Sequence, residues 1–253
     1  MIKILFRSLI EKIFGFSFLK KLYKENYSDP ELQDNFWKKS LEILKIKYFL
    51  SNSERIPSKG SCVIVSNHPF GILDGLIICS EVAKLRKDYR ILINEELTAI
   101  DHIRDYLFPL RLDNGKDSAK INIKSKNDAI EFINKGGLVI IFPSGEVATS
   151  EKLFKKAVEK NWKPIIGSIL RKVNCKILPI YCYGQNSFLF QLIGIINYKL
   201  RRIFFARELI NKSNKEFNAK CGYLLESVIF HNLENIEIAK KLRYETLKIA
   251  NLH

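Results

Sequence analysis

A histidine followed six residues later by an aspartate is the pair in this sequence best suited to acid–base chemistry. His68 and Asp74 lie in SNHPFGILDG, residues 66–75, which begins at the end of the apolar run CVIVS. Histidine is the usual general base near neutral pH, and a carboxylate bonded to its ring holds the imidazole in one tautomer. The spacing alone leaves an alternative open, namely a structural histidine beside an aspartate that caps a helix.

A second stretch with candidate binding residues also follows an apolar run. Ser144, Gly145 and Glu146 lie in FPSGEVAT, residues 142–149, directly after LVII. Such a turn can present a side chain and backbone N–H groups to a ligand, or it can be an ordinary turn with Glu146 at a helix start. A third stretch, KILPIYC at 176–182, is typical of a strand, and its internal Pro179 favours an edge or an irregular strand.

The elements that must position these residues alternate between strands and helices. The expected strands span residues 62–66, 89–94, 110–112, 138–142 and 176–182, and the expected helices span residues 30–49, 75–87, 99–108, 125–134 and 152–161. This order predicts an α/β fold with a largely parallel central sheet flanked by helices. Open folds of this class bind ligands at the carboxyl edge of the strands, where His68 and the turn at 142–149 are expected.

The N-terminal part, residues 1–50, is expected to be a helical segment ahead of the main domain, residues 51–253. A polar stretch at 51–60 marks the boundary between them. The apolar residues that recur at helical spacing near the N-terminus are Ile2, Phe6, Leu9, Ile10 and Ile13. A basic amphipathic helix of this kind can lie in a membrane interface, or it can pack on the domain.

Composition limits the possible classes of protein. The chain has 253 residues, of which 47% are hydrophobic and 27% are charged, as in folded globular chains. A disordered tail is therefore excluded. Five cysteines without CxxC spacing do not form a disulfide framework and indicate reduced thiols. The four histidines are scattered and show no ligand spacing with cysteine, so no metal is expected.

The charge is strongly positive and unevenly distributed. The net charge is +15, and residues 151–253 hold 19 Lys and Arg against 8 Asp and Glu. This excess favours an anionic partner, such as a membrane surface, an acidic protein or nucleic acid, unless it reflects genome composition alone. Because no helix-turn-helix, RNP-like or zinc-finger signature is present, no nucleic acid is expected. The apolar stretch at 188–198 is too short to span a membrane, and it can lie in the interface, line an apolar groove or form a core helix.

The three stretches, taken together and in this order, resemble the glycerolipid acyltransferase superfamily. Its members carry an Asn-His-x4-Asp block, a Phe-Pro-Glu-Gly block and a late strand that contains proline. The corresponding stretches here are NHPFGILDG, IIFPSGEVATS and KILPIYCYGQNS. The resemblance is closest to the bacterial branch of hemolysin-like and ornithine-lipid acyltransferases, and it covers roughly residues 35–225.

The resemblance implies an activity and a set of site residues. Members move a fatty acyl group from acyl-CoA or acyl carrier protein to a lyso-lipid or a related acceptor, so residues 51–253 would be the acyltransferase domain. His68 would be the general base and Asp74 its orienting partner. The positions that would bind substrate are Asn67, Arg111, Ser144, Gly145 and Glu146. No cofactor and no serine or cysteine nucleophile is implied, because the donor thioester is already activated.

The resemblance also implies partners and a location. The chain would be cytoplasmic and peripheral on the inner face of the cell membrane, where it would meet an anionic surface and its lyso-lipid acceptor. The acidic acyl carrier protein would suit the positive C-terminal part as a donor. A catalytically silent lipid-binding relative and a basic nucleic-acid-binding protein remain the alternatives.

Three departures from the family pattern concern the site. Five residues rather than four separate His68 from Asp74. One extra residue rotates a helical position by about 100°, so the two can meet only if the turn at Pro69 and Gly71 bulges. Ser144 stands where the family has a glutamate, and Arg111 is the best counterpart of another family arginine.

A further departure concerns the acceptor. Val147 replaces the arginine of a block that is taken to grip glycerol phosphate in the phosphatidate-forming enzymes. Its loss weakens the expectation of a lysophosphatidate acceptor. We expect Glu146 to bind a different head group, cationic or zwitterionic in character.

Overall fold

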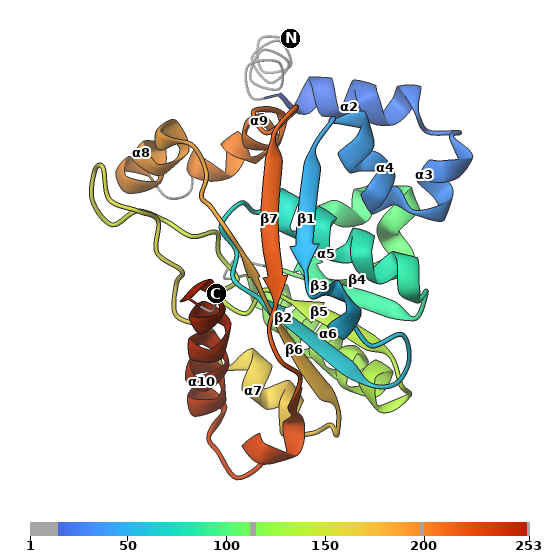
Figure 1. Ribbon diagram of the computed structural model, residues 1–253, viewed down its shortest axis with the longest axis vertical. Coiled ribbons are helices and arrows are strands. Elements are labelled where there is room, and N and C mark those ends of the chain that lie inside the picture. The colour runs from blue at the N-terminus through green and yellow to red at the C-terminus, as the bar shows by residue number, and fades with distance from the viewer. Residues whose placement is uncertain (1–14, 112–114, 198–199, 252–253) are drawn as a thin grey trace.

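A single mixed sheet carries the elements that hold the candidate residues (Figure 1). The computed structural model describes residues 15–111, 115–197 and 200–251, so the amphipathic helix predicted at residues 2–13 lies outside the described residues. The sheet has eight strands in the order β1-β7-β6-β2-β5-β3-β4, and β8 pairs with β6 beside β7. The predicted α/β fold with a largely parallel central sheet is confirmed.

The bounds of the elements follow the chain order. The strands are β1 (Lys47–Ser51), β2 (Cys62–Ser66), β3 (Tyr89–Asn94), β4 (Leu107–Leu110), β5 (Leu138–Ile141), β6 (Lys176–Cys182), β7 (Glu216–Cys221) and β8 (Leu225–Glu226). The helices are α2 (Phe16–Glu25), α3 (Pro30–Asp34), α4 (Phe36–Ile43), α5 (Ile72–Leu85), α6 (Lys116–Asn134), α7 (Ile165–Leu170), α8 (Phe188–Ile196), α9 (Phe205–Ile210) and α10 (Asn235–Lys248).

Strands β6, β2, β5, β3 and β4 run parallel to one another, whereas β1 and β7 form a parallel pair that runs against β6. Strand β2 is buried along its whole length between β6 and β5. Its side chains alternate between two cores: Ile64 packs on the side of α4 and α5, and Val63 and Val65 pack on the side of α6, α7 and α10. This central position places the residues after β2 in the middle of the carboxyl edge.

The predicted helix over residues 30–49 is wrong in its second half. Asn35 ends α3 and caps α4, because its side chain accepts the N–H of Lys38 at 3.1 Å. Lys45 has a left-handed backbone conformation with φ of 53°, which ends the helical stretch. The chain then forms β1, which pairs in parallel with β7. A strand paired to a distant segment leaves little local signal in the sequence.

Two other predicted helices are absent or shifted. Residues 152–161 form no helix, because Val158 pairs with Thr149 in an isolated bridge and Phe154 has a positive φ of 61°. Residues 99–108 form a 3-10 helix at Asp101–Tyr106 followed by β4, so the strand expected at 110–112 begins three residues earlier. Position 112 itself lies outside the described residues.

Strand β6 is an inner strand, so of the two alternatives that Pro179 favoured, an edge or an irregular strand, the edge strand is wrong. On one side, residues 176–180 of β6 pair with β2. On the other side, residues 176 and 177 pair with β8, and residues 180–182 pair with β7. Pro179 lies at this change of partner, where a strand tolerates a missing N–H donor. Within the described residues, no helix has the length and apolar character needed to cross a membrane.

Candidate active site

His68 and Asp74 are in direct contact at the carboxyl edge of β2. The Nδ1 atom of His68 lies 2.9 Å from Oδ2 of Asp74, and the side chains are 17% and 0% exposed. Asp74 is the third residue of α5, which begins at Ile72 directly after the turn formed by residues 69–71. Gly71 takes a φ of 87° in this turn, a conformation that favours glycine. The longer His-to-Asp spacing is therefore absorbed by the turn.

The surroundings of Asp74 define the tautomer of His68. Oδ2 of Asp74 also accepts the backbone N–H groups of Phe70 and Gly71, each at 2.9 Å. Because this oxygen acts as an acceptor toward both backbone groups, the Nδ1 atom of His68 is the donor in the third bond. The Nε2 atom then carries the lone pair and is available as a base.

The buried carboxylate of Glu159 holds the backbone of His68. The His68 N–H donates to Oε2 of Glu159 at 3.0 Å, and Nε1 of Trp162 donates to Oε1 of Glu159 at 3.0 Å. Burial raises the pKa of Glu159, and these donors oppose that effect. The His68 ring stacks on Phe142 with centroids 4.2 Å apart. Neither contact was predicted from the sequence, and no local spacing could reveal Glu159, which is 91 residues from His68.

Asn67 is engaged with the backbone of β6. Its amide nitrogen donates to the Cys182 carbonyl at 2.9 Å, and its amide oxygen accepts the Cys182 N–H at 2.7 Å. These two hydrogen bonds tie Asn67, the residue before His68, to the neighbouring strand. The geometry favours a positioning role for Asn67, in place of the direct contact with substrate that we expected.

The turn after β5 lies along the His68 segment. The Ala148 N–H donates to the His68 carbonyl at 2.8 Å, so the two stretches are held together by the backbone. Ser144 is buried, and its hydroxyl donates to the Glu146 carbonyl at 2.8 Å, which gives it a role within the turn. The Glu146 carboxylate is partly exposed, and no hydrogen bond or ion pair is formed with it by the described residues.

Gly145 brings a lysine to the same turn. Its φ is 64°, and a Cβ atom at this position would lie 2.9 Å from Nζ of Lys163. The Lys163 N–H also donates to the Pro143 carbonyl at 2.9 Å. The absence of a side chain at position 145 thus lets the exposed ammonium group of Lys163 lie over the turn at Gly145, the residue before Glu146. Lys163 was not among the residues predicted from the sequence, because it lies outside the three stretches with candidate residues.

Arg111 lies apart from His68. It follows β4, which is three strand positions from β2, or roughly 14 Å at the usual strand spacing. Its Nε donates to the Glu95 carboxylate at 2.5 Å, and the residue lines a cavity of about 690 Å³ beside α6. The structure therefore does not bring Arg111 together with the other predicted site residues.

A buried ion pair, formed by Lys212 and Glu208, supports the turn at residues 69–71 through Asn186. Lys212, which follows α9, donates to Oδ1 of Asn186 at 2.5 Å and to the Glu208 carboxylate at 3.3 Å. The Asn186 amide in turn donates to the Phe70 carbonyl at 3.2 Å, next to the N–H groups that hold Asp74. Burial lowers the pKa of Lys212, and Glu208 opposes this shift.

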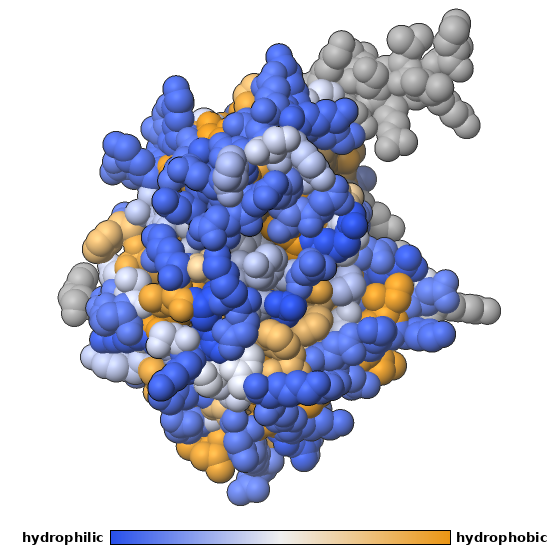
Figure 2. All heavy atoms as spheres, turned by 90° about the vertical axis from the view of Figure 1, so that its right-hand side faces the viewer, coloured by the Kyte–Doolittle hydropathy of each residue, from blue (hydrophilic) through white to orange (hydrophobic). Residues whose placement is uncertain are grey.

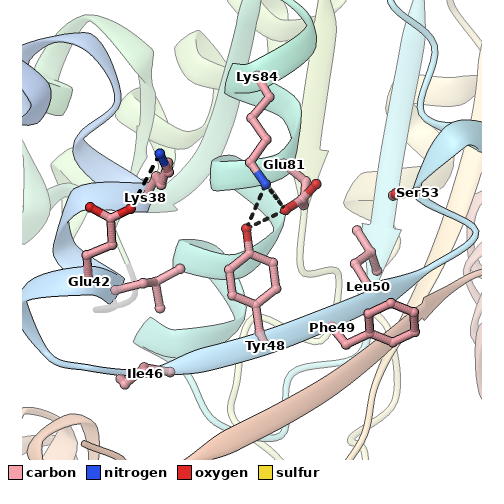
Figure 3. Close-up of a pocket in the computed structure, with 10 residues that line it drawn as sticks. Lys38, Glu42, Ile46, Tyr48, Phe49, Leu50, Ser53, Glu81 and Lys84 are labelled. Atoms are coloured by element: carbon pink, nitrogen blue, oxygen red, sulfur yellow. Dashed lines mark hydrogen bonds and ion pairs between the residues drawn. The ribbon is translucent and has the colours of Figure 1, made fainter. Parts of the chain in front are cut away.

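The pocket in Figure 3 is separate from this chemistry. It has a volume of about 380 Å³ and lies between α4, β1 and α5. Its polar groups are already paired with one another: Lys38 with Glu42, and Tyr48 with both Glu81 and Lys84. Glu81 and Lys84 belong to the last part of α5, whereas Asp74 belongs to its first turn.

The thiols and carboxylates near the site do not suggest covalent or metal chemistry. All five cysteines are buried and free, and burial raises the pKa of Cys182 well above its ordinary value. A thiol in this state is a poor nucleophile. Across the described parts of the chain, no three His, Cys, Asp or Glu side chains gather in a group that could hold a metal ion. The arrangement is that of a histidine oriented by a buried carboxylate beside a polar turn.

The comparisons with known proteins agree with this arrangement. A family model described as "Acyltransferase" matches residues 27–244. The lyso-glycine lipid O-acyltransferase of Phocaeicola vulgatus is 24% identical over 227 residues, which cover 83% of this chain and 77% of that protein. The lyso-glycine lipid O-acyltransferase of Bacteroides thetaiotaomicron is 23% identical over 230 residues, 83% of this chain and 79% of that protein.

A solved structure shares the fold. The 1-acyl-sn-glycerophosphate (LPA) acyltransferase of Thermotoga maritima matches with a TM-score of 0.56 and 17% identity, and the match covers 98% of this chain and 93% of that one. The family model spans most of the sequence, and the predicted membership is confirmed. The chain belongs to the acyltransferase family, as a lipid O-acyltransferase of the glycerolipid acyltransferase superfamily.

Proposed function

We propose that this enzyme transfers a fatty acyl group from a thioester donor to the hydroxyl group of a lyso-lipid with an amino-acid head group. The donor is acyl-CoA or acyl carrier protein. The observation that carries the chemical part is the His68–Asp74 pair, in which Nδ1 of His68 lies against the buried carboxylate and Nε2 is the other ring nitrogen. The acceptor class is supported by the two curated relatives, which act on a lyso-glycine lipid.

The reaction needs one proton relay. Nε2 of His68 takes the proton from the acceptor hydroxyl as its oxygen attacks the thioester carbonyl, and a C–O bond forms. Asp74 stabilises the imidazolium that results. The C–S bond then breaks, and the leaving thiolate takes the proton back from Nε2. The buried thiols of the protein take no part in these steps.

An N–H group of the turn after β5 would stabilise the oxyanion. The Gly145 N–H already donates to the Phe142 carbonyl at 3.0 Å, and the Glu146 N–H lies 3.4 Å from the Ser144 hydroxyl. We therefore assign this role to the N–H of Val147, which follows them in the turn. One such donor contributes about 2.7–4 kcal/mol to the transition state in acyl transfer.

The test of the proposed function is product formation with defined substrates. The purified protein, palmitoyl-CoA or palmitoyl acyl carrier protein, and either lyso-glycine lipid or lysophosphatidate are combined, and products are identified by mass spectrometry. We expect an O-acylated glycine lipid. Transfer to lysophosphatidate alone would refute the proposed acceptor, and no transfer with any donor would favour a silent lipid-binding protein.

Glu146 and Lys163 are proposed to bind the amino-acid head group, because they present opposite charges at one turn beside His68. Replacing either by glutamine is expected to raise KM for the lyso-glycine lipid by about tenfold and to leave kcat largely unchanged, because a charged hydrogen bond contributes ~1.5 kcal/mol. The measurement is steady-state kinetics with a fixed donor concentration.

The matched controls for the head-group prediction are Glu151→Gln and Lys160→Gln, which remove the same charges from exposed positions nearby. These controls are expected to keep the KM of the unmodified protein. If each control changes KM as much as the variant that loses the same charge, the effect is one of net charge, and neither Glu146 nor Lys163 contacts the acceptor.

A further inference from the structure

Helix α8 and the loop before α7 expose an unusual number of apolar side chains. They form a surface that we call the apolar rim, and it consists of Leu153, Phe154, Val158, Phe188, Ile195 and Ile196. Phe154 is 87% exposed and Ile196 is 74% exposed. Single apolar residues on a surface are ordinary, whereas a cluster from two elements points to an interaction site.

The two parts of the apolar rim lie side by side (Figure 1). The rings of Phe154 and Phe188 stack with centroids 5.2 Å apart. Two backbone N–H groups of the loop donate to glutamine side chains near α8: Ala157 to Gln185 at 2.8 Å and Ser150 to Gln191 at 2.9 Å. The loop is thus fastened to the helix with its phenylalanine still exposed to solvent. Phe154 also has a positive φ of 61°, which is rare for a bulky residue.

Helix α8 has the character of a helix that faces an apolar phase. Its nine residues, FLFQLIGII, include no charged side chain. Phe190 and Gln191 face the protein, while Phe188, Ile195 and Ile196 recur at i, i+7 and i+8 on the outer side. A helix on the surface of a water-soluble domain normally carries polar residues there.

The apolar rim is directly connected to the turn after β5, which lies along the His68 segment. Val158 pairs with Thr149 in both directions, with N···O distances of 3.0 and 3.2 Å. The neighbouring Ala148 N–H donates to the His68 carbonyl at 2.8 Å. A lipid whose tail lies at the rim would therefore have its head group near the base.

Basic residues flank the apolar rim. Lys152, Lys155 and Lys156 are exposed on either side of Leu153 and Phe154, against a single acidic neighbour, Glu151. Apolar side chains that enter the acyl boundary, together with lysines at head-group level, are the features of a surface that binds anionic bilayers. The face on the opposite side of the molecule from α8 is mainly hydrophilic, with apolar residues in small separate groups (Figure 2).

We propose that the apolar rim inserts into the interface of an anionic lipid bilayer and draws the lyso-lipid acceptor from it toward His68. This proposal rests on the proposed function for its lipid acceptor. Binding to the bilayer itself is a separate property and is measured without any turnover. The partner is a membrane surface rather than an acidic protein, because the centre of the rim is apolar and the lysines lie around it.

The test is flotation of the full-length protein with vesicles of phosphatidylglycerol and phosphatidylcholine, and with vesicles of phosphatidylcholine alone. The double variant Phe154→Glu/Ile196→Glu is expected to bind the anionic vesicles at least about tenfold more weakly than the unmodified protein, because two inserted side chains become charged. The unmodified protein is expected to prefer the anionic vesicles and to lose this preference at high salt.

The matched control is Ile229→Glu/Tyr244→Glu, which makes the same change at two exposed apolar positions outside the rim. It is expected to float like the unmodified protein. Equal flotation of both double variants would overturn the proposal, and so would a failure of the unmodified protein to bind vesicles. A change of oligomeric state in the rim variant, with vesicle binding intact, would show that the rim binds a second copy of the chain instead.

Activity separates this proposal from the proposed function. With a short-chain, water-soluble acceptor and no vesicles, the rim variant is expected to retain the rate of the unmodified protein, because no residue of the rim touches the reacting groups. A protein that binds vesicles through the rim but transfers no acyl group would contradict the proposed function alone. A protein that transfers acyl groups but does not bind vesicles would contradict the rim proposal alone.

Discussion

Replacement of His68 by alanine is expected to lower kcat by about 10²–10⁴-fold, the usual contribution of a positioned general base. Nδ1 of the His68 ring is bonded to Asp74, so Nε2 is the nitrogen that can take the proton. No other described histidine lies within reach of the Asp74 carboxylate. The loss of ring stacking on Phe142 is expected to cost only ~1 kcal/mol of the free energy of unfolding. Kinetics and thermal unfolding of the same preparation measure both effects.

His102→Ala is the matched control for the loss of His68. The His102 ring is also partly buried, is bonded to the Tyr23 hydroxyl at 2.8 Å and stacks on Phe36, so its removal costs similar packing without touching the site. The control is expected to keep full kcat. Activity retained by the His68→Ala variant would show that another group removes the acceptor proton.

Replacement of Asp74 by asparagine is expected to lower kcat by about 10²-fold. The asparagine oxygen can still accept the N–H groups of Phe70 and Gly71, so the turn keeps its shape. The negative charge that stabilises the imidazolium is lost, and a hydrogen bond to a charged group contributes ~1.5–3 kcal/mol. The effect belongs to kcat rather than to KM, because Asp74 is fully buried behind His68 and does not meet the substrate.

The Asp74→Ala variant separates charge from structure. It leaves the Phe70 and Gly71 N–H groups without their acceptor, and each buried unpaired donor costs ~1–3 kcal/mol. We therefore expect a clear fall in the temperature of unfolding for alanine and a smaller one for asparagine. Equal kcat for the asparagine variant and the unmodified protein would exclude Asp74 from the mechanism.

The parts of the site that depend on local order are predictable from the sequence. Short buried strands followed by polar turns predicted that His68 and the turn after β5 meet at the carboxyl edge of a parallel sheet, and the structure brings these segments together. The position of Arg111, which only the family resemblance suggested, depends on the order of the strands in the sheet and on the distance of β4 from β2, and neither is written in local patterns. Strand β1 escaped prediction because its partner, β7, lies far along the chain.

The way in which His68 is held depends on contacts between segments that are distant in the chain. The extra residue before Asp74 does not separate it from His68, because Gly71 takes a positive φ in the turn between them. The side chains of Phe205 and Val147 pack against Gly71. Glu159 and Lys212 reach the catalytic segment from loops that lie tens of residues away, and both are buried. Local spacing records which residues are available for chemistry, whereas burial and long-range pairing fix their geometry, since these depend on contacts between segments that the sequence keeps apart.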